Sequence, residues 1–222
     1  MEQEKVFSFL KALKKNNNRD WFEKNKSKYM AAKEEFEFLV HDLIKGISKF
    51  DKKISADTEA KDCVFRIYKD VRFSKDKTPY KTHFGASISP GGRKSPVAGY
   101  YFHLEPGSVF LAGGNWQPEP NQLQAIRQEI DYNGGKLTSI INSKGFKKYF
   151  NGLSDEDKLK TVPKGFDKEN KHVELLKLKS FIVYHELDDK KAKAKDFDKQ
   201  ITEGFKAMYP FIAFLREAGS DN

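Results

Sequence analysis

The clearest strand pattern in the sequence lies at residues 99–112, which read GYYFHLEPGSVFLA. Side chains on a β-strand point alternately to its two faces. In residues 99–105 the even positions are aromatic or aliphatic and share one face, whereas Tyr101, His103 and Glu105 share the other. Pro106 and Gly107 supply a turn, and residues 108–112 return as a second strand. The pattern predicts an antiparallel hairpin with one covered face.

Further strands are expected on both sides of this hairpin. Residues 82–89 can form a strand after the turn at Thr78 and Pro79, and residues 180–187 have the pattern of a returning strand. Residues 63–68 alternate in the same way and predict one more strand. A loop bounded by prolines, residues 90–96, precedes the hairpin. Together these stretches predict an antiparallel meander.

Amphipathic helices are predicted at both ends of the chain. Residues 3–15 carry apolar side chains at helical spacing, and between residues 21 and 50 apolar positions recur every seven residues. Residues 197–215 have the same character, with Pro210 expected to kink or split that helix. A shorter helix is expected to start near Pro120 and to break at residues 133–135.

The predicted fold class is α+β. We expect a single domain over residues 1–222, in which a mainly antiparallel sheet is covered by the N-terminal and C-terminal helices.

The composition is that of a basic protein with a single cysteine. The 222 residues include 41 Lys and Arg against 32 Asp and Glu, with a formal charge of +9. A basic balance favours phosphates or nucleic acids as partners. Cys63 has no second cysteine to pair with, which fits a reducing compartment. Neither a signal peptide nor a span of ~20 apolar residues is recognisable, so we expect a cytoplasmic protein with no membrane partner.

Cations and aromatic rings are densest in residues 65–84, FRIYKDVRFSKDKTPYKTHF. If the alternation from residue 63 continues, Arg66 and Arg72 flank a face that suits a phosphate or carboxylate. In this hypothesis the arginines clamp the anion, nearby lysines add charge and tyrosines orient the ligand. Arg127 joins them from the edge of a helical apolar stripe. The candidate ligand-binding residues are Arg66, Tyr68, Asp70, Arg72, Lys77, Tyr80, Lys81 and Arg127.

A purely structural interpretation of the same stretch stays open. Cations protect an exposed edge strand from pairing with other chains, and Asp70 and Asp76 can neutralise them. The spacing of the residues does not separate this interpretation from a binding site.

The sequence predicts no metal site and no cofactor. Residues 91–95 place Arg93 where a phosphate-binding P-loop requires glycine. His103 and Glu105 share a strand face, yet no HxH, HxxxH or CxxC spacing accompanies them. His83 follows the basic turn and is a candidate proton carrier.

Several stretches resemble one family. They are Asn16 and Asn17 before RDWF at residues 19–22, RIYKDVRFSKDKTPYK at residues 66–81, and later motifs at residues 99–101, 113–114, 127, 163–166 and 175–179. Over roughly residues 5 to 215 the chain resembles the conserved hypothetical family called domain of unknown function 2461. The resemblance implies a single-domain, cytoplasmic, mostly bacterial protein. It implies no reaction, cofactor or catalytic residue, because the family has none assigned.

Three functions remain as hypotheses. The first is a basic, tyrosine-lined pocket for a phosphate- or carboxylate-bearing small molecule. The second is an enzyme acting on a phosphorylated small molecule or nucleotide, with Asp70 or His83 handling the proton. The third is a non-catalytic nucleic-acid or protein-interaction module. The sequence leaves the identity of the ligand and the oligomeric state open.

Overall fold

Four antiparallel strands form a sheet in the order β1-β2-β3-β4. The computed structural model describes residues 2–189, 192 and 194–219. The strands are β1 (Phe84–Ile88), β2 (Gly99–Glu105), β3 (Ser108–Asn115) and β4 (Phe181–Leu187). The predicted hairpin is confirmed, with Phe102 opposite Leu111 in the β2–β3 register. The returning strand β4 adds to the outer edge of β3, so the meander is completed by a distant segment.

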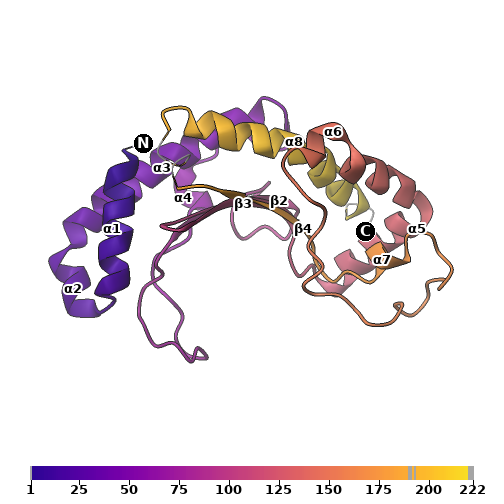
Figure 1. The fold of residues 1–222 in the computed structure, drawn as a ribbon, viewed down its shortest axis with the longest axis horizontal. Helices are drawn as coiled ribbons and strands as arrows, with labels where there is room; N and C mark the ends of the chain where they lie inside the picture. The colour runs from indigo at the N-terminus through magenta and orange to yellow at the C-terminus, as the bar shows by residue number, and fades with distance from the viewer. Residues whose placement is uncertain (1, 190–191, 193, 220–222) are drawn as a thin grey trace.

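Helices cover one face of this sheet. The helices α3 (Lys26–Ser48) and α8 (Phe197–Ala218) lie above the strands in Figure 1, and α1 (Gln3–Lys15) packs against α3 at the left of the sheet. The opposite face of the sheet curves away from α3 and α8. The α+β fold with covering helices from both ends of the chain is therefore confirmed.

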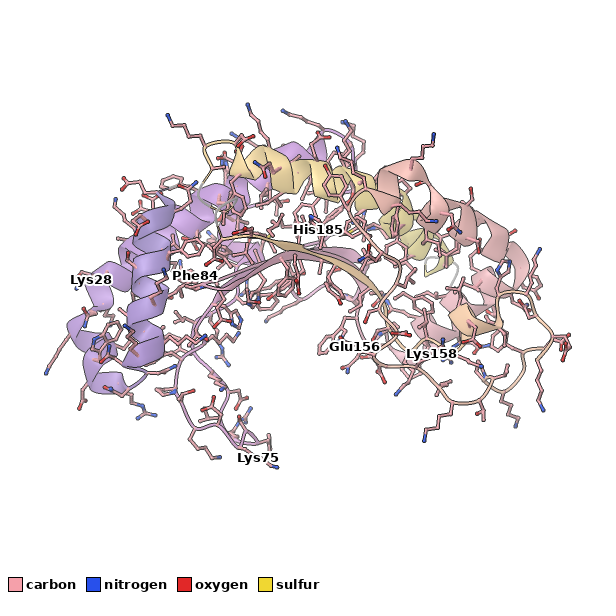
Figure 2. All side chains as sticks on the ribbon, viewed as in Figure 1. Lys28, Lys75, Phe84, Glu156, Lys158 and His185 are labelled. Atoms are coloured by element: carbon pink, nitrogen blue, oxygen red, sulfur yellow. The ribbon has the colours of Figure 1, made fainter. Side chains whose placement is uncertain are left out.

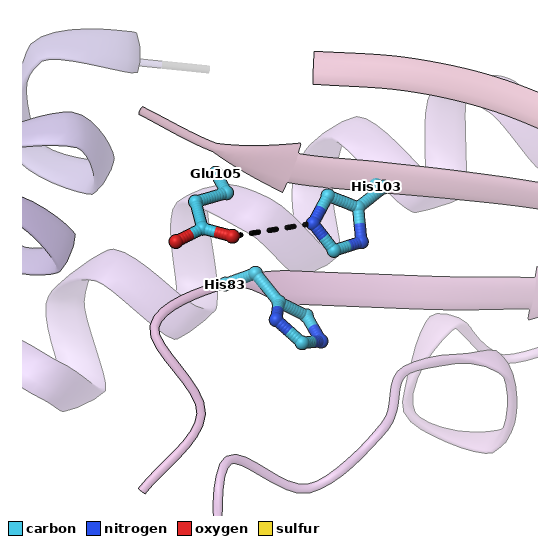
Figure 3. A group of neighbouring side chains, drawn as sticks. All are labelled: His83, His103 and Glu105. Atoms are coloured by element: carbon cyan, nitrogen blue, oxygen red, sulfur yellow. Dashed lines mark ion pairs between the residues drawn. The ribbon is translucent and has the colours of Figure 1, made fainter. Parts of the chain in front are cut away.

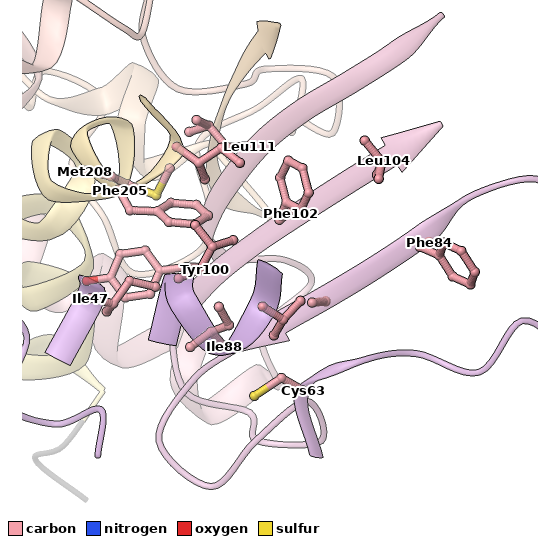
Figure 4. Packing of buried hydrophobic residues seen from close by; sticks show 14 of the residues in the cluster. Ile47, Cys63, Phe84, Ile88, Tyr100, Phe102, Leu104, Leu111, Phe205 and Met208 are labelled. Atoms are coloured by element: carbon pink, nitrogen blue, oxygen red, sulfur yellow. The ribbon is translucent and has the colours of Figure 1, made fainter. Parts of the chain in front are cut away.

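Aromatic rings fill the space between the helices and the sheet (Figure 4). The ring of Phe36 on α3 lies 5.3 Å from that of Phe84 and 6.0 Å from that of Phe102, measured between centroids. All three are buried. These contacts explain the apolar face predicted for residues 99–105, because burial of such rings is the main favourable contribution to folding.

A buried ion pair connects the end of α3, strand β2 and helix α8 on the helix-covered side of the sheet. The Asp51 carboxylate, just after α3, is fully buried and accepts hydrogen bonds from Arg216 Nη1 at 2.8 and 3.0 Å. The hydroxyl of Tyr100 on β2 donates to the same carboxylate at 2.9 Å. Arg216 belongs to α8 and also donates from Nε to the Ala98 carbonyl. A buried charge is tolerated only with such a set of partners.

A second group of helices lies beyond β3 and β4. It comprises α5 (Pro120–Asn142), α6 (Lys144–Lys147) and α7 (Val173–Leu176). The break expected at residues 133–135 appears as a kink, because Asn133 has non-helical φ and ψ while α5 continues to Asn142.

One helix prediction needs correction. The helix expected over residues 21–50 is divided into α2 (Arg19–Lys24) and α3, with Asn25 between them. Of the two outcomes expected at Pro210, the split does not occur, since α8 is continuous over Phe197–Ala218. The Pro210 ring is exposed, and Phe205, Met208, Phe211 and Ile212 are buried on both sides of it, so packing outweighs the lost hydrogen bond.

The predicted strand at residues 63–68 is wrong. Residues 60–63 form the short helix α4 (Ala60–Cys63), and residues 64–83 form an irregular arm that leaves the sheet and returns to it. The segment is paired by the isolated bridges Val64–Ala86 and Tyr68–Tyr80 and by single backbone hydrogen bonds, such as that from the Phe65 N–H to the Gly85 carbonyl. Aspartate side chains explain the irregularity, because Asp70 and Asp76 accept hydrogen bonds from nearby backbone N–H groups and favour turns over a ladder.

Among the described residues, no helix has the length and hydropathy to cross a membrane.

Candidate functional site

A cleft of about 780 Å³ lies against the face of the sheet that the helices leave open. Its floor comes from all four strands, one wall from the base of the arm, and the other from the loops before β2 and after β3. The floor is mainly apolar and includes Phe110, Ala112, Gly114 and Ile182. Its volume lies within the range of small-molecule sites. The wall residues used below are Phe65, Lys81, His83, Arg93, Lys94 and Trp116.

Lys81 is the cation of the arm that lines this cleft. Its ammonium lies over the Phe65 ring, 5.5 Å from the centroid. Burial lowers the pKa of Lys81, and the positive charge of Arg66 lowers it further. Within the described part of the chain, no carboxylate is paired with Lys81. The site therefore holds a partly buried positive charge without a neutralising partner.

The other cations of the arm do not converge on the cleft. Arg72 makes a two-pronged contact with Asp70, with hydrogen bonds of 3.0 and 2.7 Å. This pair holds the pKa of Asp70 at about 2. Lys77 donates to the Val71 carbonyl. These contacts occupy the far end of the arm, where Lys75 also lies (Figure 2). The pairing of Arg72 with Asp70 and of Lys69 with Asp76 agrees with the structural interpretation, but the edge strand it assumed is absent from residues 64–83.

The two tyrosines of the arm lie at its base. Tyr80 is buried and stacks on Phe22 of α2, with centroids 4.0 Å apart. Tyr68 pairs with Tyr80 across the arm and is 47% exposed. Arg66 is exposed. Neither tyrosine nor Arg66 lines the cleft.

Arg127 is a buried structural residue. Its Nε donates to the Leu176 carbonyl at 2.8 Å, and its Nη2 donates to the Leu178 carbonyl at 3.0 Å. These bonds fasten α5 to the segment around α7, so the guanidinium is committed away from the cleft. Of the eight predicted binding residues, all of which the structure describes, Lys81 lines the cleft and the other seven lie outside it.

Arg93 and Lys94 bring positive charge to the opposite wall. Arg93 Nη1 donates to the carbonyls of Lys61 and Asp62, at 2.9 Å each, which fixes the loop before β2 against α4. Lys94 is exposed beside it. The cleft thus has cations on both sides, with the Glu119 carboxylate and the exposed ring of Trp116 also in the loop after β3.

Asn17 fixes the wall that carries Lys81. Its side-chain amide donates to the Tyr80 carbonyl at 2.9 Å and accepts from the Tyr80 N–H at 3.1 Å, as a neighbouring strand would. We expect Asn17→Ala to reduce the free energy of unfolding by about 1–2 kcal/mol, because it leaves both partly buried backbone groups without their partner. Urea unfolding followed by circular dichroism measures the effect.

Asn16→Ala is the matched control, since among the described residues the Asn16 side chain bonds one carbonyl, that of Ala12 in the preceding helix α1. We expect almost no change from it. Equal losses from the two variants would contradict the role given to Asn17.

A second cluster lies where the arm enters β1. His83, His103 and Glu105 each offer a ligand atom, and these atoms lie within 4.8 Å of one another (Figure 3). Burial lowers the pKa of His83 to about 4, helped by His103, so its ring is neutral at physiological pH. Burial also lowers the pKa of His103. Burial opposes ionisation of Glu105, but hydrogen bonds from Thr82 and Lys14 outweigh it and hold the pKa of Glu105 below its usual range.

Spacing along the chain does not reveal this cluster, because strand pairing creates it. Phe84 pairs with Leu104, so His83 lies opposite Glu105 and next to His103 on the open face. The sequence does show that His103 and Glu105 share a strand face. It does not show which residues of β1 lie beside them, because the long loop between β1 and β2 leaves the strand register undetermined. His185 lies elsewhere, against Tyr149 and Phe150 on the helix-covered side of the sheet (Figure 2).

Searches of curated proteins and of solved structures find no match to this chain. A family model does match, over residues 5–214, and it is described as Conserved hypothetical protein (DUF2461). That stretch includes the sheet, the arm and every residue of the cleft and of the histidine cluster. The chain therefore belongs to this family of conserved hypothetical proteins.

Proposed function

We propose that the cleft on the open face of the sheet binds a small anionic molecule that carries a flat or apolar group. The observation that supports this most directly is Lys81. Its ammonium is partly buried at the cleft wall, close enough to Arg66 for the two charges to disfavour each other, and it lacks a carboxylate partner among the described residues. A phosphate or carboxylate at this position would offset both the burial of the Lys81 charge and its repulsion by Arg66.

The remaining lining supports the second half of the proposal. The rings of Phe65, Tyr101 and Phe110 face the cleft from the arm and the two central strands. Arg93 and Lys94 add positive charge on the opposite wall. An apolar pocket with a few convergent polar groups is the usual form of a small-molecule site. A ligand with its anionic group at Lys81 and its ring over the sheet would satisfy both kinds of surface.

Replacing Lys81 tests the proposal. We expect Lys81→Gln to weaken binding of the best anionic ligand by about tenfold or more, because a charge-assisted hydrogen bond in a partly buried site is lost. The measurement is isothermal titration calorimetry with inorganic phosphate, AMP and benzoate, chosen to separate the anionic group from the ring.

Lys77→Gln is the matched control, since Lys77 lies in the same arm and its ammonium bonds the Val71 carbonyl outside the cleft. We expect it to bind as the unmodified protein does. If the two variants bind alike, or if neither AMP nor benzoate binds better than phosphate alone, the proposal fails.

A second candidate is an enzyme that acts on a phosphorylated small molecule or nucleotide bound in the same cleft. His83 favours it by position, because its neutral imidazole lines the cleft wall two residues after Lys81. Its lowered pKa makes it a weak base, so a bound anion that raises this pKa would have to be part of such a mechanism. Asp70 is the weaker of the two proton carriers considered, since it pairs with Arg72 outside the cleft. Turnover of a phosphate ester that is lost in His83→Gln but kept in Asp70→Asn would support this function.

A further inference from the structure

We propose that His83, His103 and Glu105 form a binding site for a divalent transition metal of the Zn²⁺ type, with one coordination position open towards the cleft. The ligand atoms of the three residues lie within 4.8 Å of one another. The donor set is two imidazoles and one carboxylate. This combination suits zinc and iron, whereas Mg²⁺ and Ca²⁺ prefer sites made of oxygen alone.

The spacing of the donors fits a shared ion better than a direct hydrogen bond. His103 Nε2 and Glu105 Oε2 are 3.7 Å apart, which is too long for a hydrogen bond. Two ligands of a tetrahedral metal, each at about 2.1 Å, are separated by about 3.4 Å. The widest separation in the cluster, up to 4.8 Å, has to close slightly on binding. The ring of His83 can provide this movement, since it is only partly buried and no hydrogen bond holds it among the described residues.

A surrounding set of hydrogen bonds already orients the donors. The Tyr101 hydroxyl lies 3.0 Å from His103 Nδ1, which leaves Nε2 directed at Glu105. Glu105 Oε1 accepts from Thr82 Oγ1 at 2.8 Å and from Lys14 Nζ at 3.3 Å, so Oε2 is the oxygen left for a metal. Partners of this kind fix the tautomer and orientation of metal ligands in known sites.

Gly85 makes room for this arrangement. It lies opposite His103 in the β1–β2 register, and a Cβ at this position would lie 2.7 Å from the Tyr101 hydroxyl oxygen. With glycine there, the phenol can lie across β1 and reach the imidazole. The contact between Tyr101 and His103 therefore depends on the absence of a side chain at Gly85.

The open position follows from where the three side chains lie. His103 and Glu105 are largely buried, with 11% and 17% of their side chains exposed, whereas His83 lines the cleft. A metal held by these residues would be covered by its three protein ligands on one side, and its remaining coordination position would face the cleft. Three protein ligands with an open fourth position are characteristic of catalytic zinc sites.

Metal titration of the purified protein, stripped with EDTA and freed of chelator, tests the proposal. We expect one Zn²⁺ to bind per chain in calorimetry, and one Co²⁺ to give the intense visible absorption of a four- or five-coordinate ion. His83→Ala and Glu105→Gln should each weaken binding by about tenfold or more, and Tyr101→Phe by about tenfold through loss of the orienting hydroxyl. Azide should alter the Co²⁺ spectrum by entering the open position.

His41→Ala is the matched control, because the His41 side chain is 45% exposed on α3 beside Asp42 and represents adventitious surface binding. It should leave the titration unchanged. The proposal is overturned if binding is lost in His41→Ala, if it persists in both Glu105→Gln and His83→Ala, or if no saturable binding of either metal occurs. A Co²⁺ spectrum that azide leaves unchanged would overturn the open position. No organic ligand enters this experiment, so its outcome is independent of the ligand proposed for the cleft.

Discussion

Arg216→Met is expected to reduce the free energy of unfolding by about 3–5 kcal/mol, because it removes the counter-charge of a buried carboxylate. Asp51 is fully buried, and its remaining donors would be the Tyr100 hydroxyl and the Lys53 backbone N–H. Methionine fills much of the volume of arginine, so the lost charge dominates the effect. Urea unfolding monitored by circular dichroism gives the difference.

Arg72→Met provides the comparison, since Arg72 also pairs with an aspartate but is 76% exposed. We expect this variant to unfold almost as the unmodified protein does, because solvent screens exposed pairs. The double variant Asp51→Leu with Arg216→Met should recover part of the loss, as an apolar pair replaces the buried ions. A small loss in Arg216→Met would mean that water reaches Asp51.

Gly114→Ala should reduce the free energy of unfolding by about 4 kcal/mol or more, through backbone strain and a direct collision. Gly114 has φ +126°, and a Cβ there would lie 1.9 Å from the Phe181 carbonyl oxygen. Both atoms belong to paired strands, β3 and β4, so the sheet would have to separate under the cleft floor. The same unfolding measurement applies.

Gly152→Ala separates the two causes. Gly152 has φ +137°, close to that of Gly114, but a Cβ there would meet nothing within 4 Å. It should therefore show the conformational strain alone, and the difference between the variants measures the collision. Equal losses would show that strain accounts for the whole effect and that β3 and β4 can separate at little cost.

Periodicity predicts the parts of this fold that are regular and half-buried. Residues 99–105 alternate because one face packs on α3 and α8, and the strand is found with the predicted bounds. Residues 63–68 alternate as well, but their pairing is limited to isolated bridges and single backbone hydrogen bonds. Their neighbours Asp70 and Asp76 bond the local backbone, and this tendency is not visible in an apolar–polar pattern.

Residue type alone is a poor guide to the cleft. Arg72 and Arg127 have the chemistry of anion binding, but one pairs with Asp70 and the other with backbone carbonyls. Asp70 is a local partner that the sequence offered, whereas the partners of Arg127 lie about 50 residues away and depend on helix packing. The importance of Lys81 depends on its lack of a carboxylate partner within the described structure, which is a property of its surroundings. His83 meets Glu105 only once the strand register is fixed.

The late arrival of β4 has a consequence for synthesis of the chain. β3 ends at Asn115, but its neighbour β4 begins only at Phe181, after α5, α6 and α7. As the polypeptide leaves the ribosome, the first three strands emerge with one edge of β3 unpaired and without the helix α8 that covers them. Pairings so distant in sequence form slowly, so a ligand of the cleft could not assist folding until almost the whole chain had been translated.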